Sequence, residues 1–128
     1  MSDRLFVTLS KEPFGWFASG RKKWELRRVG NQFHTDHIYH GRLVELRLGY
    51  STSQSLWGCV QSIIHARSLT ELFSQVPYED VIPMASTEEE AVDVCTSILD
   101  LCSDNPSLIA FKVSRQIEEL EIDAKYVD

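Results

Sequence analysis

The chain has 128 residues, of which 43% are hydrophobic and 25% are charged, a composition that is typical of one globular domain and excludes a disordered or membrane-spanning chain. Its net charge of −6 argues against indiscriminate nucleic-acid binding. The charge is uneven, because residues 1–67 carry ten Lys or Arg against five Asp or Glu, whereas residues 68–128 carry three against fourteen. The first half could therefore form a local positive surface.

The N-terminal residues and the cysteines both predict a cytoplasmic protein. The N-terminus lacks the long apolar segment of a secretory signal, and no apolar run is long enough to cross a membrane. The three cysteines include no pair with C-x-x-C spacing, so we expect free thiols in a reducing compartment. Cys95 and Cys102 are interpreted as small core residues, because free cysteine is often buried.

The first predicted elements are a strand and a helix. Residues 4–9 are short and rich in β-formers, which indicates a strand. Ser10 is expected to cap a helix, because the apolar residues that follow it have the i, i+3, i+4 spacing of one helical face. Gly20 is expected to end this helix in a left-handed conformation.

Three further strands are predicted before the middle of the chain. Residues 22–29 and 43–48 alternate in the manner of strands, and residues 30–41 form a long loop between them. Residues 56–66 read as a long strand, with Gly58 as the expected position of a bulge. We expect the second and third of these strands to pair as a hairpin.

The second half of the chain is predicted to contain two helices and a last strand. Residues 68–71 and 86–89 both fit the capping-box pattern, so a helix should begin at each. Residues 76–83 are bracketed by prolines and predict an irregular connection, and residues 108–113 predict a strand. The order of elements predicts an α+β fold with a mainly antiparallel sheet that could close into a small β-barrel with peripheral helices.

The domain organisation and two core residues follow from the same pattern. No linker or internal repeat is present, so residues 1–128 are predicted to form a single domain with an acidic C-terminal tail at about residues 117–128. Trp57 and Phe111 are expected in the core, because each lies among alternating apolar residues.

The segment Gly-Arg-Lys-Lys-Trp-Glu-Leu-Arg, residues 20–27, is the most informative part of the chain. It places four cations and one carboxylate around a single tryptophan, a composition that buried strands do not have. On a strand, Lys23, Glu25 and Arg27 would share one face. The segment therefore indicates a polar cleft that meets an anionic or hydrogen-bonding ligand.

Within this segment, Gly20-x-Lys22-x-x-Glu25-x-Arg27 resembles the G-x-K-x-x-E-x-R signature of the ASCH domain, a PUA-like β-barrel family. The resemblance would cover nearly the whole chain, and it implies a link to RNA. Relatives often have a Gly-Asp pair where the strand after the motif loop begins, whereas this chain has Gly41-Arg42. That difference removes a carboxylate from the cleft and adds a cation.

The first hypothesis for function is binding of RNA or a nucleotide-like small molecule in a cationic cleft. Lys22 and Arg27 would contact phosphates, Glu25 would orient them, and an aromatic ring of Trp16, Trp24 or Tyr39 would stack on a base. The candidate ligand-binding residues are Gly20, Arg21, Lys22, Lys23, Trp24, Glu25, Arg27, Arg28, Tyr39, His40 and Arg42. The alternative without a ligand is a cross-strand ion pair between Glu25 and Arg27, flanked by solvated lysines.

The second hypothesis is hydrolysis, with Lys22 and Glu25 as the catalytic candidates. One branch of the family implies an amidohydrolase that acts on N4-acylated cytidine with a lysine, a threonine and a glutamate, and another implies a ribonuclease. Here Glu25 stands in place of the threonine, so the hydroxyl nucleophile is absent. A carboxylate there is also expected to keep Lys22 charged, which favours binding over chemistry.

Two remaining features give weaker predictions. His34, His37 and His40 are candidates for a zinc site, but their spacing is not a standard one, so no metal and no cofactor are predicted and solvated or phosphate-contacting histidines are expected instead. The acidic C-terminal half could bind a basic protein partner, which would make the chain an adaptor. No membrane partner is predicted.

Overall fold

The computed structural model describes residues 4–30, 32–50, 54–101 and 107–115. The predicted acidic tail at about residues 117–128 and the predicted core position of Cys102 lie outside these ranges. Among the helices in the described ranges, none has both the length and the apolar character needed to cross a lipid bilayer.

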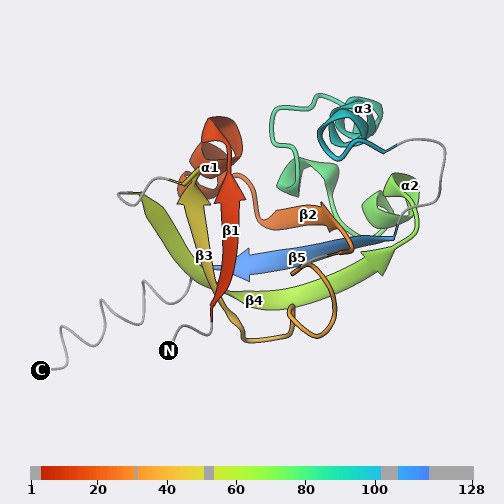
Figure 1. Ribbon diagram of the computed structural model, residues 1–128. Coiled ribbons are helices and arrows are strands. Elements are labelled where there is room, and N and C mark those ends of the chain that lie inside the picture. The colour runs from red at the N-terminus through yellow and green to blue at the C-terminus, as the bar shows by residue number, and fades with distance from the viewer. Residues whose placement is uncertain (1–3, 31, 51–53, 102–106, 116–128) are drawn as a thin grey trace, which may run out of the picture.

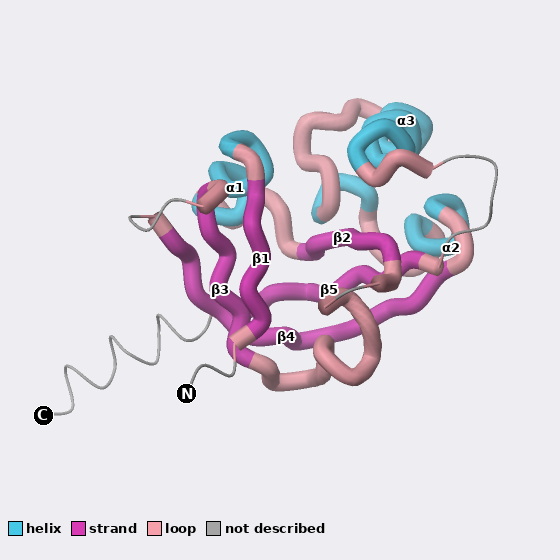
Figure 2. Tube along the Cα trace, viewed as in Figure 1, coloured by secondary structure: helices cyan, strands magenta, loops and turns pink. Residues whose placement is uncertain are grey.

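Five strands form one curled sheet, which has the shape of a half-barrel (Figures 1 and 2). The strands are β1 (Leu5–Leu9), β2 (Trp24–Arg28), β3 (Leu43–Leu48), β4 (Ser55–Ala66) and β5 (Leu108–Ser114). Their order in the sheet is β1-β3-β4-β5-β2, and every pairing is antiparallel except that of β1 with β3. The predicted α+β fold with a mainly antiparallel, barrel-like sheet is confirmed, as is the hairpin of β3 and β4.

The helices lie at the rim of the half-barrel and over one of its ends (Figure 1). They are α1 (Lys11–Ala18), α2 (Leu69–Phe73), the single 3-10 turn η1 (Tyr78–Asp80) and α3 (Glu88–Ile98). Ser68 caps α2 as predicted, because its hydroxyl accepts from the N–H of Glu71 at 3.0 Å. The predicted capping residue of α3 was wrong by one position.

The cap of α3 is Thr87, not Ser86. The Thr87 hydroxyl accepts from the N–H of Glu90 at 3.1 Å, and the Glu90 carboxylate accepts from the N–H of Ser86 at 3.3 Å. The reciprocal arrangement of a capping box is thus present, but shifted along the chain. At α1, Ser10 occupies the capping position without a capping bond from its side chain.

Two side chains close the gap between the edge strands β1 and β2. The Arg27 Nη2 donates to the Thr8 carbonyl at 2.9 Å, and the Gln32 Nε2 donates to the Phe6 carbonyl at 2.6 Å. These bonds satisfy two carbonyls of β1 that would otherwise lie on an unpaired edge. We call this junction the seam.

The apolar side chains form two clusters. One lies inside the curl against α1, and its large buried members include Phe17 and Phe111. The other lies under α2, η1 and α3, and it contains Trp24 and Cys95. The core positions of Cys95 and Phe111 are confirmed.

Trp57 is not a core residue, so that prediction was wrong. It is half-buried and lies opposite Glu45 in the register, whereas its neighbour Leu56 lies opposite the buried Leu46. Since successive residues of a strand point to opposite faces, Leu56 packs against the core and Trp57 lies on the outer face.

Gly58 is required for close packing of two strands, not for a bulge. The irregularity in β4 lies between Val60 and Ser62, and Gly58 pairs regularly with Val44. A Cβ at Gly58 would lie 2.4 Å from the carbonyl oxygen of Ser114, on the neighbouring strand β5. Such a contact can be relieved only by moving the backbone.

We expect Gly58→Ala to lower the free energy of unfolding by about 1–3 kcal/mol, the usual cost of inserting a methyl group into packed structure. Urea unfolding would measure this change. Gly15→Ala is the matched control, because a Cβ there would meet nothing within 4 Å, and alanine in a helix should stabilise by about 0.5–1 kcal/mol. Equal stability of Gly58→Ala and the parent chain would contradict the prediction.

Candidate functional site

A pocket of about 270 Å³ lies between the C-terminal end of β1, α1, β2 and the segment that leads into α3. Most of its wall is apolar, and a smaller group of polar side chains lies among these residues. The lining residues are Thr8, Leu9, Ser10, Pro13, Trp16, Lys22, Glu25, Leu26, Arg27, Val81, Ile82, Cys95, Ile98 and Leu99. Apolar walls with a few convergent polar groups are typical of small-ligand sites.

The turn after α1 places Lys22 in this pocket. Gly20 adopts φ +79°, a conformation that favours glycine, and the N–H groups of Arg21 and Lys22 then both donate to the Trp16 carbonyl, at 2.9 and 3.1 Å. The N–H of Lys23 donates to the Asp80 carbonyl at 2.8 Å. Backbone bonds thus hold the first part of the motif, residues 21–23, in place before β2 begins.

Three charged side chains form a network in the pocket. The Lys22 Nζ donates to the Val81 carbonyl at 2.6 Å and lies 3.6 Å from Glu25 Oε1. Glu25 Oε2 accepts from both Nε and Nη2 of Arg27, at 2.9 and 2.7 Å. Lys22 and Glu25 are each only 5% exposed, so this is a buried network and not a surface ion pair.

Burial shifts the pKa of two groups in the pocket. Desolvation lowers the pKa of Lys22 from its ordinary value, although the neighbouring Glu25 carboxylate acts in the opposite direction. Desolvation also raises the pKa of the Cys95 thiol to about 11, with Lys22 opposing the shift and Glu25 adding to it. Glu25 thus acts to keep Lys22 charged, as expected, but burial acts more strongly on this pKa and in the opposite direction.

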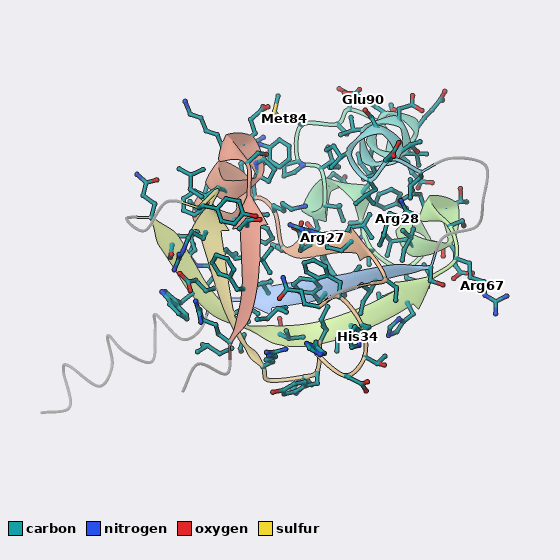
Figure 3. All side chains as sticks on the ribbon, in the orientation of Figure 1. Arg27, Arg28, His34, Arg67, Met84 and Glu90 are labelled. Carbon is teal, nitrogen blue, oxygen red and sulfur yellow. The ribbon has the colours of Figure 1, made fainter. Side chains whose placement is uncertain are left out.

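Only part of the predicted motif faces the pocket. Lys22, Glu25 and Arg27 converge there, while Arg21, Lys23 and Arg28 are exposed outside its lining. Figure 3 shows Arg27 beside β2 and Arg28 farther toward α2. The predicted cationic cleft is thus a smaller pocket with one carboxylate and two cations.

Of the three rings proposed to stack on a base, only one lines the pocket. Trp16 lies in its wall, half-buried. Trp24 is 8% exposed and packs in the cluster under α2 and α3, so it offers no stacking surface. Tyr39 is 43% exposed and lies outside the lining.

The predicted residues of the 30–41 loop lie at the other end of β1. Arg42 donates to the carbonyl of His37 and, at 3.3 Å, to the carbonyl of Arg4, which precedes β1. Its guanidinium lies 5.6 Å from the centre of the Tyr39 ring. The prediction that Tyr39, His40 and Arg42 share one cleft with Lys22 and Arg27 is therefore wrong. The pocket lies at the opposite end of β1.

The histidine loop gives no support to a zinc site. The rings of His34 and His37 meet edge to face at 4.4 Å, and Figure 3 shows His34 on the loop below the sheet. Within the described ranges, no group of three or more His, Cys, Asp or Glu side chains is arranged to hold a metal ion. The predicted protein-partner surface stays a prediction, with Glu88, Glu89 and Glu90 exposed in the first turn of α3.

Most of the pocket lining was not predicted from the sequence. Val81 and Ile82 come from the connection that was interpreted as irregular, and the carbonyl of Val81 is the acceptor for Lys22. Cys95 and Leu99 lie on the apolar face of α3, whose periodicity predicted a core contact but gave no sign of a pocket. Their role depends on tertiary packing, which no local pattern reveals.

Comparison of the sequence with known families and proteins finds one short family match. The Leucine Rich Repeat family matches residues 42–61, and no curated protein matches the chain. In the structure the matched residues include β3 and the start of β4, an antiparallel hairpin. A leucine-rich repeat instead combines one strand with a helical segment and stacks on further repeats, so the match does not describe this fold.

Comparison with solved structures shows the fold. The hypothetical protein PH0355 has a TM-score of 0.68 at 20% identity, over 85% of this chain and 95% of that one. Protein PF0455 from Pyrococcus furiosus has a TM-score of 0.63 at 19% identity, over 87% and 96%. The ASCH protein from Zymomonas mobilis has a TM-score of 0.56 at 14% identity, over 85% of this chain and 65% of that one.

Proposed function

We propose, for a chain that has the fold of an ASCH domain, that the pocket binds one nucleobase with its sugar, either as a free nucleotide or within an RNA strand. The observation that carries this proposal is the Lys22–Glu25–Arg27 network, which lies in a pocket with otherwise apolar walls. Its volume of about 270 Å³ lies near the lower end of small-ligand pockets, so it suits one nucleoside and not a folded oligonucleotide.

Two parts of a nucleotide, the base and the phosphate, have matching groups in the pocket. The ring of Trp16 offers a stacking surface to a base, and stacking tolerates any base because each has a π face. Arg27 Nη1 has no bonding partner among the described residues, so it can donate to a base edge or a phosphate. Glu25 is already bonded to Arg27, and we assign it the role of holding both cations in place.

Titration with UMP, CMP, AMP and GMP, followed by calorimetry or NMR, tests this function. We expect Arg27→Met to weaken binding about ten-fold or more, since a hydrogen bond from a charged donor is worth about 1.5–3 kcal/mol. Trp16→Leu should weaken it about five-fold or more without disturbing the ion network. Arg28→Met is the control, because that arginine is exposed outside the pocket. If no nucleotide binds, or if both pocket variants bind like the parent chain, the proposal fails.

Hydrolysis is the second candidate, and the lowered pKa of Lys22 favours it. A buried amine that loses its proton more readily is a better general base than an exposed lysine. The same protein samples should therefore be incubated with N4-acylated cytidine and with single-stranded RNA. Product that is lost in Lys22→Ala would support an enzyme, whereas no turnover of either substrate would leave binding as the function.

A further inference from the structure

The outer face of β1, β3 and β4 carries a cluster of arginines and aromatic rings that lies outside the lining of the pocket. Phe6, Glu45 and Trp57 lie side by side across the three strands, because Phe6 pairs with Glu45 and Glu45 pairs with Trp57. We call this surface the arginine face. It comprises Arg4, Phe6, Leu43, Glu45, Arg47 and Trp57.

The arginines of this face are held in fixed positions. Glu45 accepts from Arg4 and from Arg47, whose Nε lies 2.9 Å from Oε2, and also from the Ser55 hydroxyl at 2.6 Å. The guanidinium groups of Arg4 and Arg47 lie 5.4 and 4.7 Å from the centre of the Phe6 ring. Arginines held in this way lose little further entropy when they bind a ligand.

The face continues past Arg4 to the loop. Arg42 donates to the Arg4 carbonyl and lies over the exposed ring of Tyr39. Two arginines bond to the buried carboxylate of Glu45 and a third, Arg42, lies beside Arg4, which leaves a local excess of positive charge on a protein with a net charge of −6. Arg4, Arg42 and Arg47 are three of the ten Lys or Arg in residues 1–67, and none of the three lines the pocket.

We propose that the arginine face binds single-stranded RNA and takes the nucleotides that flank the one held in the pocket. Pre-positioned arginines beside half-buried or exposed aromatic rings are the combination used to bind single strands, in which cations contact phosphates and rings stack on bases. An acidic protein partner would match the charge but would not need the rings of Trp57 and Tyr39. Binding of RNA to the arginine face takes from the proposed function only the class of ligand, whereas the flanking arrangement also rests on a nucleotide in the pocket.

The two sites are adjacent along β1. Thr8 lines the pocket and accepts from Arg27, and the same residue pairs with Arg47 of the arginine face. Neighbouring strands of a sheet lie about 5 Å apart, so a single strand of RNA could reach both sites. Arg47 Nη1 has no partner among the described residues and is therefore available to a phosphate.

Fluorescence anisotropy with a labelled uridine oligomer of about ten nucleotides tests this proposal, because that length falls within the range of single-strand sites. We expect Trp57→Leu and Tyr39→Leu each to weaken binding of the oligomer about five-fold or more, while the affinity for UMP stays unchanged. Arg47→Met should reduce the slope of log affinity against log salt by about one. Arg67→Met, an exposed arginine at the far end of β4, should bind the oligomer like the parent chain.

The outcomes separate this proposal from the function of the pocket. Oligomer binding that depends on Trp57, together with no binding of UMP, would support RNA binding by the arginine face and contradict nucleotide binding by the pocket. The arginine face is ruled out if the oligomer does not bind, if all three variants bind it like the parent chain, or if UMP and oligomer affinities fall by the same factor. A poly-glutamate peptide that displaces the oligomer, with no effect of Trp57→Leu, would assign the face to an acidic protein. Trp57→Leu leaves the ion network intact, so the test survives if Arg47→Met does not fold.

Discussion

We expect Glu25→Gln to lower the free energy of unfolding by about 3–5 kcal/mol, because it leaves the buried ammonium of Lys22 without a counter-charge. The remaining bond of Lys22, to the Val81 carbonyl, satisfies one donor but does not neutralise the charge. Urea unfolding at neutral pH would measure the loss. Glu12→Gln is the control, because that carboxylate is exposed in α1 and its removal should change stability by no more than about 0.5 kcal/mol.

A second variant shows whether the lysine is the cause of this loss. Lys22→Met in the Glu25→Gln background removes the uncompensated charge, so we expect the double variant to be more stable than Glu25→Gln alone. If adding Lys22→Met instead lowers stability further, the cost of Glu25→Gln arises elsewhere, for example at Arg27.

The pH dependence gives an independent check. The pKa of Lys22 is lower in the folded chain than in the unfolded one, so the unfolded chain binds more protons between these two values and Lys22 makes stability rise with pH there. Removal of Glu25 lowers this pKa further, so the rise in Glu25→Gln should begin at a lower pH. The raised pKa of Cys95 has the opposite effect above pH 9, and measurements below that pH avoid it.

We expect Glu45→Gln to lower the free energy of unfolding at neutral pH by about 3 kcal/mol. Each unit by which folding lowers a carboxyl pKa corresponds to about 1.4 kcal/mol of stability, and the variant lacks this contribution. Burial acts to raise the pKa of Glu45, but the bonds from Ser55, Arg4 and Arg47 outweigh it and lower the pKa from 4.5 to about 2. The carboxylate therefore stabilises the fold above pH 4.5, and this contribution is lost as the pH falls toward 2.

Unfolding measured between pH 2 and pH 7 tests this prediction directly. The parent chain and Glu45→Gln should differ most at neutral pH and approach one another toward pH 2, where about half of the parent carboxyl is protonated. The exposed Glu79→Gln should run parallel to the parent chain over the same range. A difference between Glu45→Gln and the parent that is the same at every pH would show that the carboxylate acts through packing and not through its charge.

The sequence predicted the order of the elements because local patterns decide most of them. Periodicity and the Ser68 cap located the strands and α2, and the alternation in residues 22–29 correctly placed Glu25 and Arg27 on one face. The errors arose where two neighbouring residues offered equal signals. Leu56 and Trp57 are both apolar, and Ser86 and Thr87 can both cap, so only the register and the carboxylate of Glu90 decide between them.

The site could be predicted only within the motif. The alternation of the strand placed Glu25 and Arg27 on one face, whereas Lys22 followed from the resemblance to the ASCH signature and not from the alternation, which had favoured Lys23. The wall formed by Val81 and Cys95 comes from segments far along the chain. The residues of the 30–41 loop were assigned to the same cleft because they follow the motif. In the structure the loop leads to the other end of β1, and proximity in sequence does not become proximity in space.

Arg27 both joins β1 to β2 at the seam and lines the pocket in which we propose that a ligand binds. Because side chains and not a backbone ladder join β1 to β2, these strands can separate without the loss of any strand pairing. A ligand that bonds to Nη1 of Arg27 leaves the seam closed, whereas one that takes Nη2 from the Thr8 carbonyl opens half of it. Which of the two Nη atoms of Arg27 a ligand takes would thus decide whether β1 and β2 stay joined at Thr8.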